Sequence, residues 1–175
     1  MTINVYDNYQ WKVPKAIYVW NANANAWSET TSVSIWANSN WQKIHNTYIF
    51  TSNTVNANIY TTMGSPTIPI NAKITIDENV WMTSANSNVA AIDIGGFPLG
   101  SRVYLVNNGV IQGNIGSNAG WDGGNAIATT NPLIINNLNT IGGGAGNTTG
   151  GAGYYLSGSA YTTFENAGFL TGLVG

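Results

Sequence analysis

A set of glycines recurs without gaps after 30 residues, and this spacing limits the possible folds more than any other feature of the chain. The first set comprises Gly113, Gly116, Gly120 and Gly123, and the second comprises Gly143, Gly146, Gly150 and Gly153. The residues ahead of each set match as well, since 103–105 (Val-Tyr-Leu) correspond to 133–135 (Leu-Ile-Ile). Such a repeat indicates a supersecondary unit that buries its apolar face against the next copy. A third, glycine-free copy lies at 74–81, so residues 73–160 are predicted to form about three stacked strand units.

The glycine runs lack the side chains of an ordinary core, so any order in them depends on backbone contacts. Glycine steps of three, four and three residues are typical of the three-residue turn of a polyproline-II-type helix with one slip. Glycine at each contact lets extended backbones approach closely, with weak Cα–H···O contacts between neighbours. A flexible linker is the alternative interpretation. The ordered one is favoured, because a linker has no reason to keep its glycine spacing from one repeat to the next.

The rest of the sequence indicates an all-β fold made of short strands. Asn, Gly, Thr and Ser are abundant, and all four are mediocre or poor in helix interiors. Several short stretches alternate in the manner of half-buried strands, for example 16–20 (Ala-Ile-Tyr-Val-Trp), 32–36 (Ser-Val-Ser-Ile-Trp) and 73–76 (Lys-Ile-Thr-Ile). Disordered chains have high charge and few aromatic residues, whereas here charged residues make up 7% and aromatic residues 11%.

Tryptophans flank two Asn-rich spacers in the N-terminal part of the chain. Trp20 and Trp27 flank the first spacer, and Trp36 and Trp41 flank the second. Each unit is predicted to be a hairpin in which the two tryptophans pair across the strands. Because all four keep their repeat positions, they are interpreted as core residues or as residues that dock onto another subunit.

Chain-breaking residues lie between the two repeat regions, in the segment Met-Gly-Ser-Pro-Thr-Ile-Pro at 63–69. We therefore expect a Trp-containing hairpin-repeat region at 1–62. A glycine-rich strand-repeat domain would follow at 63–175.

The composition excludes several classes of partner. The net charge is −2 and the five basic residues are scattered, whereas DNA or RNA binding needs a clustered basic face. No apolar run approaches the ~18 residues of a membrane span, so membrane insertion is not expected. The N-terminus lacks the basic and apolar regions of a signal peptide. This predicts a protein that stays in the producing cell or leaves it by lysis, as a virion does.

Residues suited to catalysis are sparse, and neither enzymatic activity nor a cofactor or metal is expected. His45 is the only histidine, the chain has no cysteine, and no G-x-S-x-G motif occurs. His45 is therefore interpreted as a hydrogen-bonded or exposed strand residue. Asp77 and Glu78 are adjacent in an expected strand, so their side chains should point to opposite faces rather than form the carboxylate pair of a glycosidase.

Aromatic residues beside amides favour sugar binding in and after the glycine runs. A flat ring stacks on the apolar face of a sugar, while Asn and Asp side chains bond its hydroxyls. The candidate receptor-binding residues are Trp121, Asp122, Asn114, Asn118, Tyr154 and Tyr155. For Trp121, which stands opposite Gly151 in the repeat, the alternative is local core that covers neighbouring backbone.

Several segments resemble proteins of bacteriophage tails. Residues 93–101 (Asp-Ile-Gly-Gly-Phe-Pro-Leu-Gly-Ser) and 105–113 (Leu-Val-Asn-Asn-Gly-Val-Ile-Gln-Gly) are similar to glycine-rich C-terminal domains of phage tail fibre and tail-tip proteins. Residues 134–137 and 141–144 resemble the distal tail-fibre adhesins of T-even-like phages. The first tryptophan unit looks like the V-W-x-G-x-x-W-K repeats of phage tail proteins.

The resemblance implies a structural virion protein of the phage tail, assembled in the host cytoplasm. In those adhesins, glycine-rich polyproline-II helices pack as a sandwich and variable loops touch the receptor. Residues 63–175 would then be distal and bind a host surface glycan or another outer-envelope component, while residues 1–62 dock onto other tail proteins. The alternative is a purely architectural fibre-shaft or baseplate adaptor. A symmetric trimer, common in fibres, and a monomer that caps a fibre both stay open.

Overall fold

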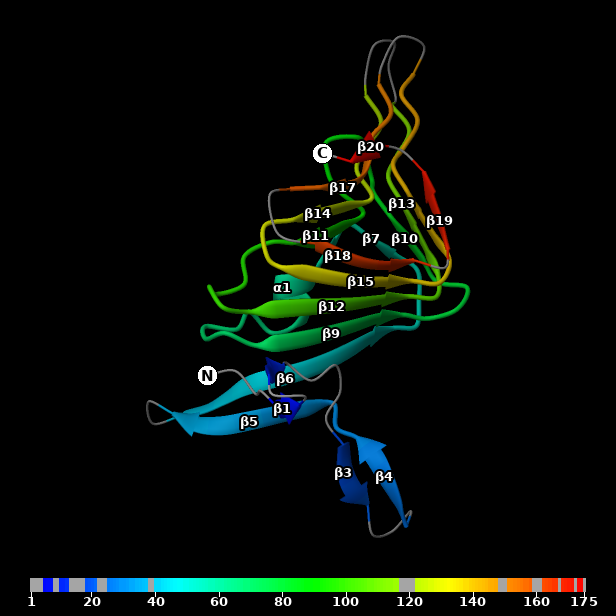
Figure 1. Cartoon of the computed structure of the whole chain (residues 1–175). Helices are drawn as coiled ribbons and strands as arrows, with labels where there is room; N and C mark the ends of the chain where they lie inside the picture. The colour runs from blue at the N-terminus through cyan, green and yellow to red at the C-terminus, as the bar shows by residue number, and fades with distance from the viewer. Residues whose placement is uncertain are drawn as a thin grey trace.

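The computed structural model of the chain describes residues 5–7, 10–12, 18–21, 25–37, 40–116, 122–147, 151–158, 162–166, 168–171 and 173–174. These residues form an almost purely β structure (Figure 1). The helix α1 (Ile59–Thr62) is a single turn, and the Asn58 side chain caps it by accepting a hydrogen bond from the Thr61 N–H. The expected all-β class is confirmed.

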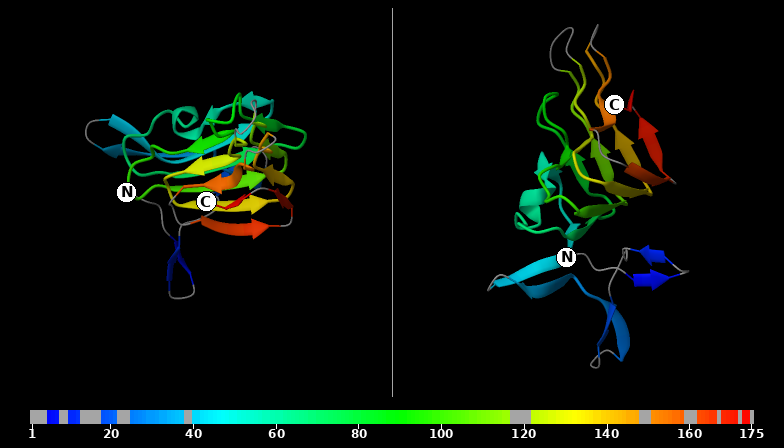
Figure 2. Two further views of the ribbon diagram at one scale, coloured as in Figure 1. Left: turned by 90° about the horizontal axis from the view of Figure 1, so that it is seen from above. Right: turned by 60° about the vertical axis from the view of Figure 1, so that its left-hand side comes forward.

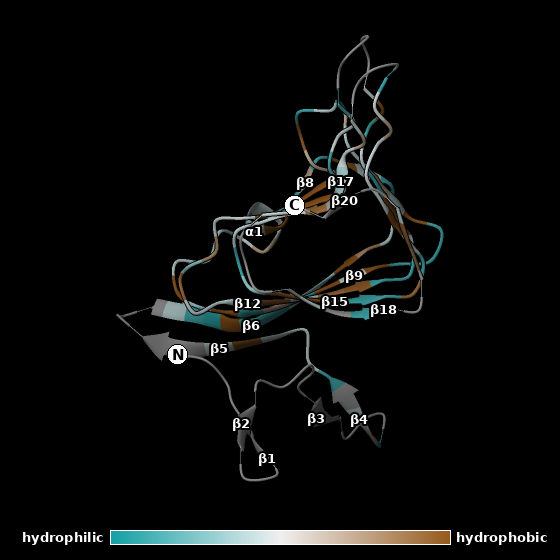
Figure 3. Cartoon of the chain, turned by 45° about the horizontal axis from the view of Figure 1, so that its top comes forward, coloured by the Kyte–Doolittle hydropathy of each residue, from teal (hydrophilic) through white to brown (hydrophobic). Residues whose placement is uncertain are grey.

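Three parallel sheets wind around one core as a β-solenoid, whose walls are visible in Figure 3. The first wall has the strand order β18-β15-β12-β9-β6-β5, the second β19-β16-β13-β10-β7, and the third β20-β17-β14-β11-β8. Each coil of the described chain contributes one strand to each wall, and β5 adds an antiparallel edge strand to the first wall.

The described residues form five coils. Their strands are β6 (Asn40–Phe50), β7 (Thr54–Val55) and β8 (Ala57–Asn58); β9 (Asn71–Ile76), β10 (Trp81–Thr83) and β11 (Ile92–Ile94); β12 (Arg102–Asn107), β13 (Val110–Gln112) and β14 (Ile127–Thr129); β15 (Leu133–Asn137), β16 (Thr140–Gly142) and β17 (Tyr154–Ser157); and β18 (Thr162–Asn166), β19 (Phe169–Thr171) and β20 (Leu173–Val174).

The 30-residue sequence repeat corresponds to one coil. Val103 pairs with Leu133 and Ile111 with Ile141, which are both offsets of 30 residues in register. The three units expected at 73–160 are the second, third and fourth coils. The structure adds one coil before them and one after, because β6 pairs in parallel with β9, and β15 with β18.

The core consists of columns of apolar side chains that stack from coil to coil. Ile74, Leu105 and Ile135 are register partners in the first wall, and none of the three is exposed to solvent. Alternating residues point inwards, as the burial of β12 and β15 shows. Each such side chain contributes about 1.5–3 kcal/mol through burial, so the columns are a main source of stability.

Two buried asparagines continue the stack at the corner between the first and second walls. Asn107 donates a hydrogen bond from Nδ2 to Asn137 Oδ1 at 2.8 Å, and Asn137 donates to the Asn139 carbonyl at 3.1 Å. Buried polar groups need hydrogen-bond partners. At this corner, where the main chain turns, the asparagine amide groups donate to each other and to main-chain carbonyls.

The described N-terminal residues form hairpins, of which those of β1–β2 and β3–β4 lie outside the coils (Figure 2). β1 (Val5–Asp7) pairs with β2 (Gln10–Lys12), β3 (Tyr18–Asn21) with β4 (Ala26–Glu29), and β5 (Ser32–Ala37) with β6. Trp20 lies opposite Trp27 and Trp36 opposite Trp41 in register. The two predicted tryptophan hairpins are therefore confirmed.

The strands β6 to β8 lie within residues 1–62, yet they form the first coil of the same solenoid as the later strands. Residues 63–70 connect this coil to the second one. The division into an attachment region and a receptor-facing domain stays a prediction.

Candidate functional site

The described parts of the glycine runs leave the solenoid between its second and third walls and project from it side by side (Figure 1). We call the described residues 113–116, 122–126, 142–147 and 151–153 the glycine projection. Its ascending limbs are joined by hydrogen bonds from the Gly113 N–H to the Gly142 carbonyl and from the Gly116 N–H to the Ala145 carbonyl, both 2.9 Å. The loops thus continue the stacking of the coils beneath them.

Further bonds join the ascending and descending limbs of the glycine projection. The Gly124 N–H donates to the Asn114 carbonyl at 2.7 Å within the first loop, and the Gly153 N–H donates to the Gly144 carbonyl at 2.7 Å within the second. The Gly144 N–H donates to the Gly124 carbonyl at 2.8 Å and connects the two loops. The described limbs form one hydrogen-bonded body, whereas the polyproline-II geometry of the runs stays a prediction.

Glycine is required here because the backbones approach too closely for a side chain. A Cβ built on Gly123 would collide with the Gly144 carbonyl, and one built on Gly144 with the Asn114 carbonyl. The same holds for Gly153 against the Gly124 carbonyl. A rigid backbone cannot give way as a flexible side chain does, so these positions exclude every other residue type without a rearrangement.

A groove of about 570 Å³ runs along the base of the glycine projection. Its polar lining comes from three consecutive coils: Ser87 and Asn88 from the loop after β10, Asp122 and Asn125 from the first glycine loop, and Tyr154 from the end of the second. Residues 151–153, which carry no polar side chain, also line the groove. Two of the predicted binding residues, Asp122 and Tyr154, therefore line one groove.

The carboxylate of Asp122 is exposed but held in place. Its Oδ1 accepts a hydrogen bond from the Gly151 N–H at 2.6 Å, which links it to the next coil. A Cβ at Gly151 would lie 3.2 Å from the same oxygen, so a substitution there would require only a small shift of the Asp122 side chain. The groove thus presents a positioned acceptor, the group that hydroxyls or amines of a ligand would bond.

Asn125 positions Tyr154 from the neighbouring coil. Its Oδ1 accepts from the Tyr154 N–H at 3.0 Å, and its Nδ2 donates to Ser157 Oγ at 3.0 Å. Asn125 is not among the residues predicted from the sequence, although it stands 29 residues before Tyr154, one coil away. Ser87 and Asn88 were not predicted either, because their loop contains no glycine and gives no repeat signal.

Asn114 is not among the described residues that line this groove. Asn114 is half-buried on the ascending limb, where its N–H donates to Ser84 Oγ at 2.6 Å and its Nδ2 to the Ser84 carbonyl at 3.1 Å. Tyr155 belongs to β17. Asn118 and Trp121 lie outside the described residues.

The predicted docking tryptophans belong to the N-terminal hairpins, which are distant in sequence from the residues that line the groove. Trp27 and Trp41 are 68% and 66% exposed, respectively. Side chains this exposed contribute little to a core. For these two tryptophans the structure therefore favours a surface role.

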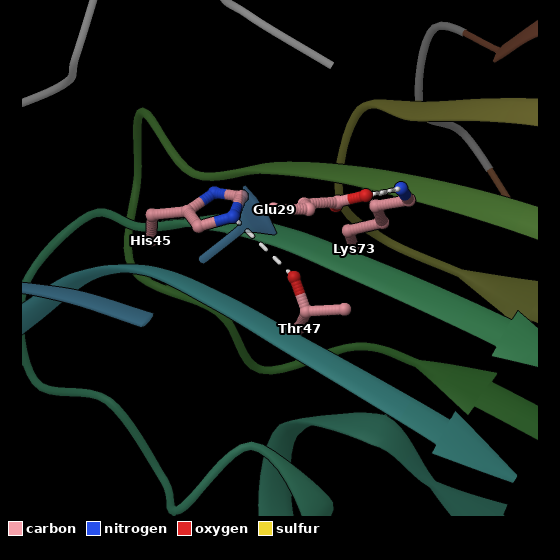
Figure 4. Close-up of polar contacts among 4 residues, drawn as sticks. All are labelled: Glu29, His45, Thr47 and Lys73. Carbon is pink, nitrogen blue, oxygen red and sulfur yellow. Dashed lines mark hydrogen bonds and ion pairs between the residues drawn. The ribbon is translucent and has the colours of Figure 1, made fainter. Parts of the chain in front are cut away.

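His45 lies on the face of β6 opposite the core, beside β4 and β9 (Figure 4). It is buried, and its Nε2 lies 3.4 Å from Thr47 Oγ1. Nearby, the Glu29 carboxylate forms an ion pair with Lys73 Nζ at 2.8 Å. Burial lowers the pKa of His45, and the Lys73 charge lowers it further, while Glu29 raises it. His45 is therefore a buried, hydrogen-bonded strand residue that is uncharged at neutral pH.

The expected placement of Asp77 and Glu78 is wrong. β9 ends at Ile76, and both acids are exposed in the turn that follows, where Asn79 has φ +66°. The corner between two walls interrupts the strand at this point. Among the described residues, no group of three or more His, Cys, Asp and Glu side chains could hold a metal ion. Within the same part of the chain, no helix is long and apolar enough to cross a membrane.

Comparison with known families places the chain among phage proteins. The model of the family described as Phage tail fibre adhesin Gp38 matches residues 37–172. The chain belongs to this family. No curated protein and no solved structure matched it. As a phage tail fibre adhesin, it is a structural component of the virion tail, a role that is not catalytic. The family match spans the coils, except for β20, and the glycine projection, whereas the hairpins of β1 to β4 precede it.

Proposed function

We propose that this adhesin binds the host cell surface through the groove at the base of the glycine projection. The observation that carries the proposal is the convergence of Asp122 and Tyr154, from different coils, on one groove. Each is tied to a neighbouring coil by a hydrogen bond from a main-chain N–H to a side-chain oxygen. The described limbs of the glycine projection, which line the groove, lie at the opposite end of the molecule from the hairpin of β3 and β4 (Figure 1). That position suits contact with a surface ahead of the fibre.

The groove chemistry fits a surface glycan. The exposed ring of Tyr154 offers a face on which the apolar side of a sugar can stack. The Asp122 carboxylate accepts from hydroxyls, and the Asn88 amide can both donate and accept. Because Asp122 and Tyr154 are each tied to a neighbouring coil, their relative position is set before the ligand arrives, which reduces the entropy lost on binding.

Binding of purified protein to host cells tests the proposal. Tyr154→Ala removes the stacking ring and Asp122→Asn removes the charged acceptor, and each should weaken cell binding roughly tenfold, as the loss of a central contact does. Leu99→Ala is the matched control, because Leu99 is 97% exposed in another loop. Normal cell binding by both groove variants would overturn the proposal and favour the purely architectural alternative.

We also infer that the tryptophan hairpins attach the adhesin to other tail proteins. The exposure of Trp27 and Trp41 supports this second role, since exposed tryptophans are enriched at protein interfaces. Attachment would be completed during virion assembly in the host cytoplasm. Either a homotrimer or a single copy capping a trimeric fibre is compatible with this arrangement, and sedimentation of the purified chain separates the two.

A further inference from the structure

The second wall carries an exposed column of side chains on its outer face. Trp81, Val110, Thr140 and Phe169 are the first residues of β10, β13, β16 and β19, and they are register partners. Trp81 is 50% exposed and Phe169 is 76% exposed, at the two ends of the column. Three strand spacings separate them, which is about 14 Å. Two aromatic rings thus flank a flat surface of one valine and one threonine.

A shallow groove of about 410 Å³ lies at the corner beside this column. Asp77, Glu78, Asn108, Leu138 and Asn139 line it, from the turns that directly precede β10, β13 and β16. The Asn139 Nδ2 donates to the Asn108 carbonyl at 2.9 Å, which fixes the amide against the next coil. The groove and the column are therefore parts of one surface, which we call the flank.

The charge of the flank limits what can bind there. Among the described residues of the flank, Asp77 and Glu78 are the charged ones, and none is a Lys, Arg or His. After Arg102 the sequence contains no basic residue at all. A phosphorylated or carboxylated ligand would meet repulsion without a compensating cation.

We propose that the flank binds a linear polysaccharide that lacks acidic groups. Sugar rings stack on Trp81 and Phe169, the chain runs along the column between them, and hydroxyls or amines bond Asp77 and Glu78. A regular coil-to-coil spacing suits a polymer of regular repeat. A folded protein partner is disfavoured, because the two rings stand apart on a flat surface instead of clustering at a desolvated centre. This site is separate from the groove at the glycine projection, and its test requires no host cells.

Affinity electrophoresis of the full chain tests the proposal, in gels that contain dextran, pullulan or hydroxyethyl cellulose, three uncharged polymers, with polygalacturonate as the acidic probe. Retardation is expected with at least one of the first three polymers and not with polygalacturonate. Trp81→Ala and Phe169→Ala should each weaken that retardation roughly fivefold, whereas Leu99→Ala should not. Trp81→Phe retains a ring and should keep most of the binding, which separates loss of stacking from misfolding.

Three outcomes would overturn the proposal: no retardation by dextran, pullulan or hydroxyethyl cellulose; equal retardation by polygalacturonate; or full retention of binding by both alanine variants.

Discussion

Replacing Gly144 by alanine tests whether backbone packing holds the glycine projection together. A Cβ at this position would overlap the main-chain oxygen and carbon of Asn114. The limbs must then separate, which breaks the bonds from the Gly124 N–H to the Asn114 carbonyl and from the Gly144 N–H to the Gly124 carbonyl. Overpacking costs about 1–3 kcal/mol and each lost bond about 1 kcal/mol. The expected loss in the free energy of unfolding is therefore about 3–5 kcal/mol.

Thermal unfolding by circular dichroism, together with amide hydrogen exchange, measures this loss. If the projection unfolds with the coils, Tm should fall by about 6–20 °C for a chain of this size. If it opens locally, Tm holds while amides at 113–116 and 142–147 exchange faster. Gly151→Ala is the matched control from the same run, because its Cβ would meet only the Asp122 side chain. A Gly144→Ala variant with the Tm and the exchange rates of the wild type would refute backbone packing and favour a flexible linker.

Two further predictions concern the N-terminal half. His45 has a folded-state pKa below its ordinary value of 6.5, so the unfolded chain takes up the proton first as the pH falls. The free energy of unfolding should be level above about pH 6.5 and decline below it, and chemical denaturation should show a shallower decline in His45→Gln. Trp27→Ala and Trp41→Ala should change Tm little, as exposed positions do, yet reduce capture of other tail proteins from virion lysate. Undiminished capture would count against the docking role.

The repeat architecture was predictable because it depends on the spacing of residues along the sequence. A coil of a solenoid repeats its inward-facing positions at nearly constant intervals, so Ile111 and Ile141 could be matched from the sequence and are register partners in the structure. The tryptophan hairpins were predictable for a similar reason, since turn residues and flanking aromatics lie within a few residues of one another.

The candidate sites depended on contacts that sequence spacing does not reveal. The offset between paired strands is 26 residues between His45 and Asn71, but 35 between Ile92 and Ile127, because loops of different length leave the coils. A constant period therefore could not place the loop of Ser87 and Asn88 beside Asp122.

The sequence by itself determined which residue types are available for binding. The tertiary structure decided which of these residues lie close enough together to form a site. The sequence identified Asp122, Asn114 and Tyr154 as residues suited to sugar binding, but only the stacking of the coils set Asp122 and Tyr154 on a common groove and turned Asn114 towards Ser84. It likewise provided Trp81 and Phe169 without relating them, because they lie 88 residues apart in the chain. Parallel stacking brings them into one column, since each coil returns the chain to the same wall one strand spacing farther along the axis.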